Sequence, residues 1–188
     1  MNDFTGKIKT IWISGLSSAG KTSLARKVVN RLQENSFPSL LIDGNETRDI
    51  FQPKLGFDPI SRRKQTKRMM NLAKWVIKQR IMPVVAMIHP FEDDRIKCLK
   101  EIPGYYETHL KCNIDECIRR DQKNVYSSKS FIVGMDIPYE EPVSADHILE
   151  SDKLNTEELL ELLWSDVSAR LYDNRLDKED LEFNVQSR

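Results

Sequence analysis

Apolar residues along this chain form short continuous runs that alternate with longer stretches of helical spacing. Runs typical of buried strands cover residues 10–14, 39–44, 82–88, 106–112 and 147–149. Elsewhere apolar residues recur every three or four positions, which predicts helices over 22–35, 69–77, 115–120 and 155–171, and a short one ending at residue 102. We expect Thr156 to cap the last helix. Strands that alternate with helices indicate an α/β fold with a parallel β-sheet flanked by helices on both faces.

The polar break between the first strand and the first helix is the most informative stretch. It reads Gly15-Leu16-Ser17-Ser18-Ala19-Gly20-Lys21-Thr22 and fits the phosphate-binding pattern G-x-x-x-x-G-K-[ST]. Two glycines let backbone N–H groups turn inward around a phosphate, Lys21 reaches the outer phosphates, and Thr22 can ligate magnesium. Because the loop joins a strand to a helix N-terminus, we interpret it as a nucleotide site rather than an incidental glycine-rich turn. The fold predicted is therefore a P-loop kinase fold.

The composition narrows the class of protein further. The 188 residues suffice for one well-buried core, and we expect a single P-loop kinase domain over 1–171 and a charged extension over 172–188. With 29 basic and 29 acidic side chains and no long apolar run, the chain lacks the signature of a nucleic-acid or membrane binder. Cys98, Cys112 and Cys117 have no metal-ligand spacing and predict buried, reduced thiols in a cytoplasmic protein.

Two polar side chains follow predicted strands, at the sheet edge where such folds bind ligands. Asp43 ends the second apolar run, where its carboxylate can approach a magnesium ion or an attacking hydroxyl; the alternative is a helix cap. His89 ends the third run and is a second candidate. His109 lies within the fourth strand and is interpreted as structural.

Two polar segments are candidates for the rest of a kinase site. Residues 45–67 are rich in arginine and lysine and contain Phe57, so this segment can hold an anionic substrate and stack a base, or it can be a solvated helix face. Residues 122–136 follow a short helix and are candidates for the lid that covers the phosphates, with a plain surface loop as the alternative.

Motifs in a fixed order give the chain a specific resemblance from Ile11 to about Ser151. After the phosphate loop come Asp43-Gly44 with Arg48, Leu55-Gly56-Phe57 with Arg62, Ile88-His89-Pro90-Phe91 with Arg95, Arg120-Asp121, Tyr126, Gly134-Met135-Asp136 and Pro138-Tyr139-Glu140-Glu141-Pro142. This order resembles the adenylylsulfate kinase family, whose members phosphorylate the ribose 3′-hydroxyl of adenylyl sulfate.

The resemblance implies a magnesium- and ATP-dependent kinase with a small-molecule nucleotide as its partner, and leaves a homodimer open. It implies catalytic roles for Lys21 and Asp43, and magnesium held by Thr22 and, through water, by Asp43. The position of His89 at the end of the third strand makes it a further catalytic candidate. The implied ATP site is Gly15, Leu16, Ser17, Ser18, Ala19, Gly20, Lys21, Thr22, Ser23 and Arg120. The implied substrate site, in which Phe57 stacks the base, is Arg48, Phe57, Arg62, Gln65, Ile88, Pro90 and Phe131.

Departures from the family pattern keep three hypotheses open. Asn45 replaces an acidic residue, His89 a serine and Gln65 an asparagine, while Ser127 and Ser128 stand where the shortened lid usually has paired lysines. The lost lid charge predicts that adenylyl sulfate is a poor acceptor and that a nucleotide of lower terminal charge is better, unless Lys123 or Lys129 compensates. The hypotheses are an adenylyl sulfate kinase, a kinase for another nucleotide such as cytidine diphosphoramidate, and a non-catalytic nucleotide-binding module.

Overall fold

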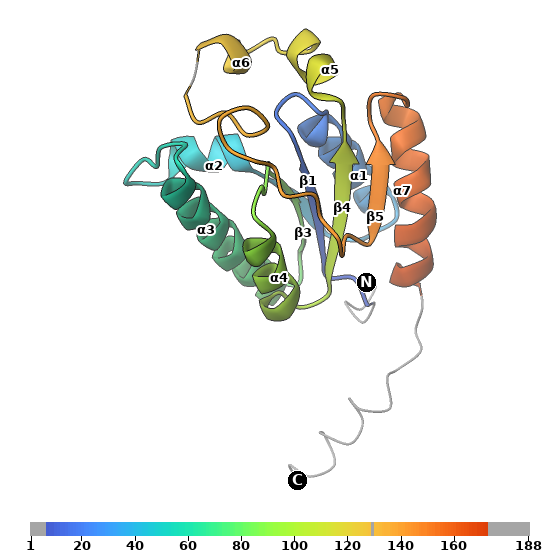
Figure 1. Ribbon diagram of the computed structural model, residues 1–188. Helices are drawn as coiled ribbons and strands as arrows, with labels where there is room; N and C mark the ends of the chain where they lie inside the picture. Colours follow the sequence, from blue (N-terminus) through green and yellow to red (C-terminus); the bar gives the residue numbers. More distant parts are fainter. Residues whose placement is uncertain (1–6, 129, 173–188) are drawn as a thin grey trace.

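The computed structural model describes residues 7–128 and 130–172 (Figure 1). In chain order, the elements are β1 (Thr10–Gly15), α1 (Lys21–Glu34), β2 (Ser39–Asp43), α2 (Gly44–Ile50), α3 (Pro59–Lys78), β3 (Met82–Ala86), α4 (Glu92–Glu101), β4 (Tyr105–Lys111), α5 (Ile114–Arg119), α6 (Val125–Ser128), β5 (His147–Glu150) and α7 (Thr156–Leu171).

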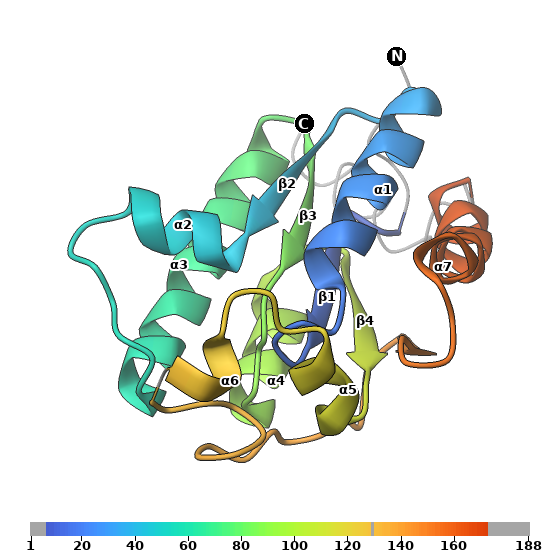
Figure 2. The ribbon, with the colours of Figure 1, turned by 90° about the horizontal axis from the view of Figure 1, so that it is seen from above.

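The five strands form one parallel sheet in the order β2-β3-β1-β4-β5. The central strand, β1, pairs with β3 on one side and with β4 on the other, so Trp12 lies beside Val85 and Glu107. Helices cover both faces of this sheet (Figure 2). The predicted α/β fold of the P-loop kinase type is confirmed.

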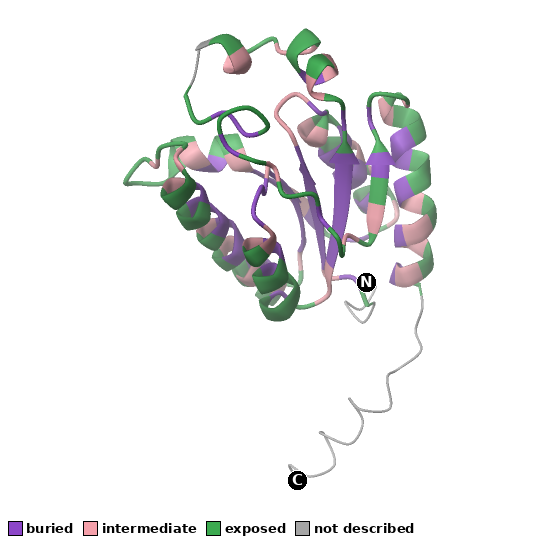
Figure 3. Cartoon of the chain, viewed as in Figure 1, coloured by how far each residue is buried: buried purple, intermediate pink, exposed green. Residues whose placement is uncertain are grey.

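Alternate residues of β1 face two separate apolar cores. Ile11 and Ile13 belong to the cluster that includes the buried residues of α1 and α7. Trp12 belongs to the other cluster, with α3 and α4. The central strands β1, β3 and β4 are almost continuously buried, as Figure 3 shows for β4. Because both faces are covered, even the polar residues of β4, such as Glu107 and Thr108, are buried.

The helices differ from the sequence prediction at three places. The 45–67 segment contains α2, and α3 begins at Pro59, well before the predicted start at residue 69. The Asp58 carboxylate accepts a hydrogen bond from the Ser61 N–H at 3.0 Å, and proline suits the first helical turn. The cap of α7 is Asn155, not Thr156, because Asn155 and Glu158 form a reciprocal capping box.

The carboxyl ends of the strands meet at one edge of the sheet and position the site. The phosphate loop follows β1, the turn into α2 follows β2, and residues 87–91 follow β3, with α5 and α6 at the same end of the molecule (Figures 1 and 2). The 1–171 domain boundary stays a prediction, and of the 172–188 extension only Tyr172 lies within the described residues. Over those residues, no helix has the length and apolar character needed to cross a membrane.

A layer of polar side chains lies buried between the sheet and α4. Glu107 is 2% exposed, and its Oε1 atom has no hydrogen-bond partner among the described residues. Burial raises the pKa of Glu107 to about 7, although Ser14 and Arg95 oppose the shift. The nearby His89 Nδ1, 3.9 Å from Oε1, does not neutralise the carboxylate, because burial lowers the pKa of His89 to about 3.

We expect Glu107→Gln to stabilise the protein at alkaline pH. A carboxyl group whose pKa is raised on folding stabilises fully below its unfolded pKa, and this stability is lost as pH rises through the folded pKa. The window here runs from about 4.5 to about 7. At pH 8 the variant should gain up to about 3 kcal/mol over the parent, and little at pH 5. Urea unfolding at both pH values measures this, with Glu161→Gln as an exposed control. If the free energies of unfolding of Glu107→Gln and the parent differed by the same amount at pH 5 and pH 8, the prediction would be wrong.

Candidate active site

The phosphate loop adopts a conformation that its two glycines permit. Gly15 has φ of 141°, and a Cβ atom there would lie 2.6 Å from the Leu110 carbonyl oxygen. Gly20 has φ of 93°. Both positions therefore require glycine, one for close backbone approach and both for the dihedral angle. Lys21, the first residue of α1, is half-buried and donates from Nζ to the Leu16 carbonyl at 2.5 Å.

Asp43 connects the phosphate loop to the second strand. Its Oδ2 accepts a 2.6 Å hydrogen bond from the Thr22 hydroxyl, while Oδ1 accepts from the Asn45 N–H at 2.8 Å. Asp43 is 5% exposed and is also the N-cap of α2. The helix-cap interpretation is confirmed, and the same carboxylate also lies at the cavity beside Thr22, while its role at the magnesium ion or the hydroxyl stays a prediction.

The chemistry of this pair fits a magnesium ion. A hydroxyl oxygen and a carboxylate oxygen are the hard donors that Mg²⁺ takes, together with phosphate oxygens and water. The pair lies at the start of α1, where Lys21 and the loop face the same cavity. Thr22 would hold the ion directly and Asp43 through water, and the ion would supply charge neutralisation at the phosphates.

A guanidinium–aromatic cluster faces this pair. The guanidinium carbon atoms of Arg48 and Arg62 lie 4.9 and 5.7 Å from the centroid of the Phe57 ring. Arg48 donates to the carbonyls of Leu55 and Gly56, which fixes the turn that carries Phe57. Arg62 is 7% exposed, and burial together with the nearby Arg48 lowers its pKa to about 10. Two partly desolvated cations beside one ring suit an anionic ligand with a flat group.

Gln65, which lies on α3, forms hydrogen bonds to the turn between β2 and α2. Its Nε2 donates to the Thr47 hydroxyl at 2.8 Å and weakly to the Gly44 carbonyl at 3.4 Å. The Thr47 hydroxyl in turn donates to the Asp43 carbonyl at 2.9 Å. Thr47 was not anticipated from the sequence, because a lone threonine in a polar helix carries no spacing signal.

One cavity of about 460 Å³ brings the predicted ATP and substrate residues together. Its wall includes Lys21, Thr22, Asp43 and Asn45 on one side and Arg48, Phe57, Arg62, Gln65, Ile88 and Pro90 on the other. Ser17, Ser18, Gly20, Ser23 and Arg120 also line it. Gly15, Leu16, Ala19 and Phe131 are not among its lining residues. Phe131 instead offers its carbonyl to Arg62 at 2.9 Å.

The position of His89 does not support the catalytic role expected for it. The residue is 0% exposed, and the centroid of its ring lies 5.2 Å from that of the Trp12 ring. Its Nε2 atom lies 3.8 Å from the Cys98 sulfur. Its φ is 55°, and its carbonyl accepts a 2.7 Å hydrogen bond from Arg95. His89 is one of the residues that line the cavity, together with Ile88 and Pro90, but it has no exposed surface. His109 is also buried, as its structural interpretation requires, and all three cysteines are buried free thiols, as predicted.

Residues 120–128 approach the cavity from the carboxyl side of α5. Arg120 is held by Glu116 at 2.5 Å and by the Ser151 carbonyl at 2.9 Å, so its guanidinium is fixed at the cavity wall. Lys123 also lines the cavity, whereas Ser127 is exposed. The Tyr126 hydroxyl donates to the Ser17 carbonyl at 2.9 Å. Lys129 lies outside the described residues.

Known proteins resemble this chain along most of its length. The profile of the family described as adenylylsulphate kinase matches residues 7–150. The adenylyl-sulfate kinase of Bacillus pumilus is 32% identical over 155 residues, which are 79% of each chain, and that of Bacillus velezensis is 31% identical over 81% of each chain. The structure of the Mycobacterium tuberculosis APS kinase in complex with AMPPNP and APS is similar with a TM-score of 0.74 and 27% identity, covering 83% of this chain and 97% of that one.

The matched residues include the phosphate loop, both carboxyl-edge turns and the guanidinium–aromatic cluster. The chain thus belongs to the adenylylsulphate kinase family, whose members are ATP-dependent P-loop kinases that phosphorylate a hydroxyl group.

Proposed function

We propose that this protein transfers the γ-phosphate of ATP to the ribose 3′-hydroxyl of adenylyl sulfate or a closely similar nucleotide. The observation that carries the proposal is the shared cavity, which is lined both by the Thr22–Asp43 pair and by the cluster of Arg48, Phe57 and Arg62. One end is suited to the phosphates of ATP and the other to a second anionic molecule with an aromatic base. Such an arrangement places two substrates next to each other, as phosphoryl transfer requires.

Each residue has a physical task in this reaction. The loop N–H groups and Lys21 neutralise charge on the β- and γ-phosphates, and magnesium would add to this neutralisation. Arg48 and Arg62 hold the anionic part of the acceptor, and Phe57 stacks its base. Asp43 orients the Thr22 hydroxyl. Where the reaction uses a general base, Asp43 is the carboxylate that takes this role. Asn45 cannot accept a proton, which a loose phosphoryl transfer tolerates because it depends mainly on positioning and charge.

A different nucleotide acceptor, such as cytidine diphosphoramidate, is the second candidate. Serine at 127, where the family has a lysine, leaves the lid with less charge for the terminal group of the acceptor. Lys123 on the cavity wall supports adenylyl sulfate, because it supplies a lid cation from another position. A nucleotide-binding module without transfer is the third candidate, and the intact Lys21, Thr22 and Asp43 argue against it.

The decisive experiment is a product assay with ATP, magnesium and a panel of nucleotide acceptors, read by mass spectrometry. We expect a 3′-phosphorylated product from adenylyl sulfate, formed with an efficiency that the lost lid charge lowers. A charge-assisted contact is worth about 1.5–3 kcal/mol, so each missing lid contact lowers the efficiency for this acceptor by roughly ten- to a hundredfold. A clearly higher kcat/KM for cytidine diphosphoramidate would replace the first candidate by the second. If no acceptor gave a product, the third candidate, a nucleotide-binding module without transfer, would remain.

Replacing Lys21 by alanine should abolish most transfer. The phosphates lose their point charge while the backbone cradle remains, and we expect kcat/KM to fall by at least about a hundredfold. Lys27→Ala is the matched control, because Lys27 lies on the same helix and pairs with Glu157 on the surface. Steady-state kinetics on both variants measure the effect. Transfer by Lys21→Ala within a few-fold of the parent would refute the assignment.

Replacing Arg62 by alanine should weaken acceptor binding much more than ATP binding. Loss of one buried charge-assisted contact predicts an acceptor affinity lower by roughly ten- to a hundredfold and an ATP affinity within about twofold. Arg63→Ala is the control, since Arg63 is the next residue but is partly exposed, pairs with Asp94 of α4 and is not among the residues that line the cavity. Separate titrations of the two ligands give the comparison. Equal losses for both ligands would show that Arg62 acts on the fold and not on the acceptor.

A further inference from the structure

The outer side of the phosphate loop is held by side-chain donors. The loop can direct its N–H groups toward a phosphate only while its carbonyls point the other way. Two of these carbonyls accept side-chain hydrogen bonds, that of Leu16 from Lys21 Nζ at 2.5 Å and that of Ser17 from the Tyr126 hydroxyl at 2.9 Å.

The two donors differ in what ATP does to them. Lys21 is the residue that the loop motif directs to the outer phosphates, so the three donors of its ammonium group are shared between the Leu16 carbonyl and the phosphates when these are bound. Tyr126 has no such second task. Its bond to Ser17 can persist with ATP in place and keep the loop in the conformation that binds phosphate.

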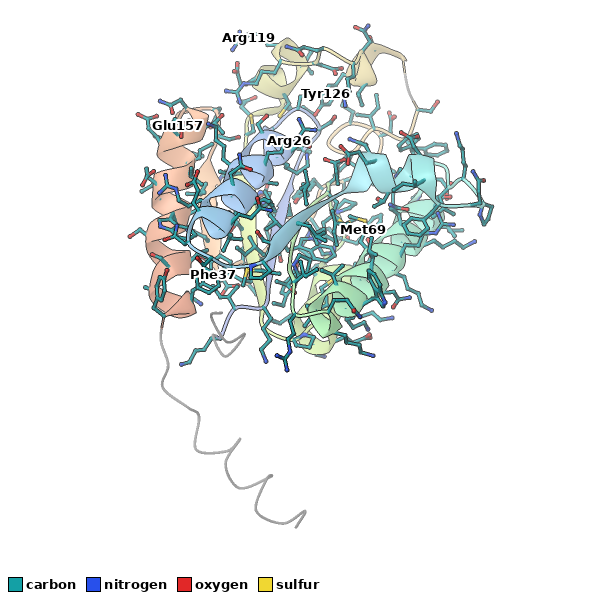
Figure 4. The ribbon with its side chains drawn as sticks, turned by 180° about the vertical axis from the view of Figure 1, so that it is seen from behind. Arg26, Phe37, Met69, Arg119, Tyr126 and Glu157 are labelled. Atoms are coloured by element: carbon teal, nitrogen blue, oxygen red, sulfur yellow. The ribbon has the colours of Figure 1, made fainter. Side chains whose placement is uncertain are left out.

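Tyr126 also belongs to the segment that approaches the cavity. The Asp121 carboxylate accepts hydrogen bonds from the Tyr126 N–H at 2.8 Å and from the Lys123 N–H at 3.2 Å, which closes this segment into a compact turn. Gln122, Lys123 and Val125 of the same segment line the cavity. Figure 4 shows Tyr126 at the end of the molecule where α5 and α6 lie. The hydroxyl of Tyr126 therefore sets the distance between this segment and the loop.

The surroundings of Tyr126 keep its hydroxyl a donor. The ring is half-buried and packs against the apolar cluster that includes Cys117 and Leu24. Burial, together with the nearby Cys117 and Asp121, raises the pKa of Tyr126, so the phenol stays protonated at every working pH. Phenylalanine would fill the same space and remove only the hydrogen bond.

We propose that Tyr126 is a positioning residue for phosphoryl transfer, whose hydroxyl ties residues 121–126 to the phosphate loop. The bond is a tie to the loop that is not shared with the phosphates, and it holds the segment that carries Lys123 at the cavity. This inference rests on ATP use and does not depend on which nucleotide accepts the phosphate.

The test is Tyr126→Phe, with Tyr106→Phe as the matched control. The Tyr106 hydroxyl donates a hydrogen bond to the Asp166 carboxylate of α7, and neither residue lines the cavity. We expect Tyr126→Phe to raise the dissociation constants of ADP and of a non-hydrolysable ATP analogue by about three- to tenfold. In nucleotide-free protein, the amide hydrogens of residues 121–126 should exchange faster in this variant than in the parent or the control.

Two results would overturn the proposal. One is unchanged nucleotide affinity with unchanged amide exchange in Tyr126→Phe. The other is an equal loss of affinity in both variants, which would point to general destabilisation. Failure of the proposed acceptor is a separate outcome, because nucleotide binding and amide exchange are measured without any acceptor.

Discussion

The hydrogen bond between Thr22 and Asp43 is the contact on which both halves of the site depend. It joins the first turn of α1 to the end of β2, across the intervening strand β3. The same carboxylate caps α2, the helix that carries Arg48 to the acceptor side. One buried side chain therefore fixes the phosphate loop, the expected magnesium position and the direction of the acceptor helix. A change at this contact would move all three together.

The ATP half of the site could be predicted from sequence because nearly all of it is contiguous. Residues 15–23 form one loop and one helical turn, so spacing alone determines where Lys21 and Thr22 lie. The acceptor half depends on α2 and the start of α3, which hydrophobic periodicity does not detect. The one buried residue of α2 is Thr47, and the first buried residues of α3 are Arg62, Gln65 and Thr66. The motif resemblance identified Arg48, Phe57 and Arg62 where the periodicity could not.

His89 shows why the position of a residue along a strand does not determine its role. The pattern correctly placed it at the carboxyl end of β3, beside the cavity. Its φ is positive, and its fully buried ring lies beside Glu107 and Trp12. A left-handed conformation at a non-glycine residue depends on the surroundings, here on the Arg95 hydrogen bond to its carbonyl. No spacing rule carries that information.

The charges around the cavity are consistent with the two anionic substrates that we propose for it. Lys21, Arg48 and Arg62 line it, and Asp43 is the one carboxylate on the wall formed by the phosphate loop and α2. Burial lowers the pKa of Lys21 to about 8 and that of Arg62 to about 10. Charge repulsion from Arg48 contributes to the lower pKa of Arg62. These shifts mean that the empty cavity holds its cations at an energetic cost. Bound phosphates and an anionic acceptor relieve that cost, so part of the binding free energy comes from neutralising charges that the fold has already desolvated.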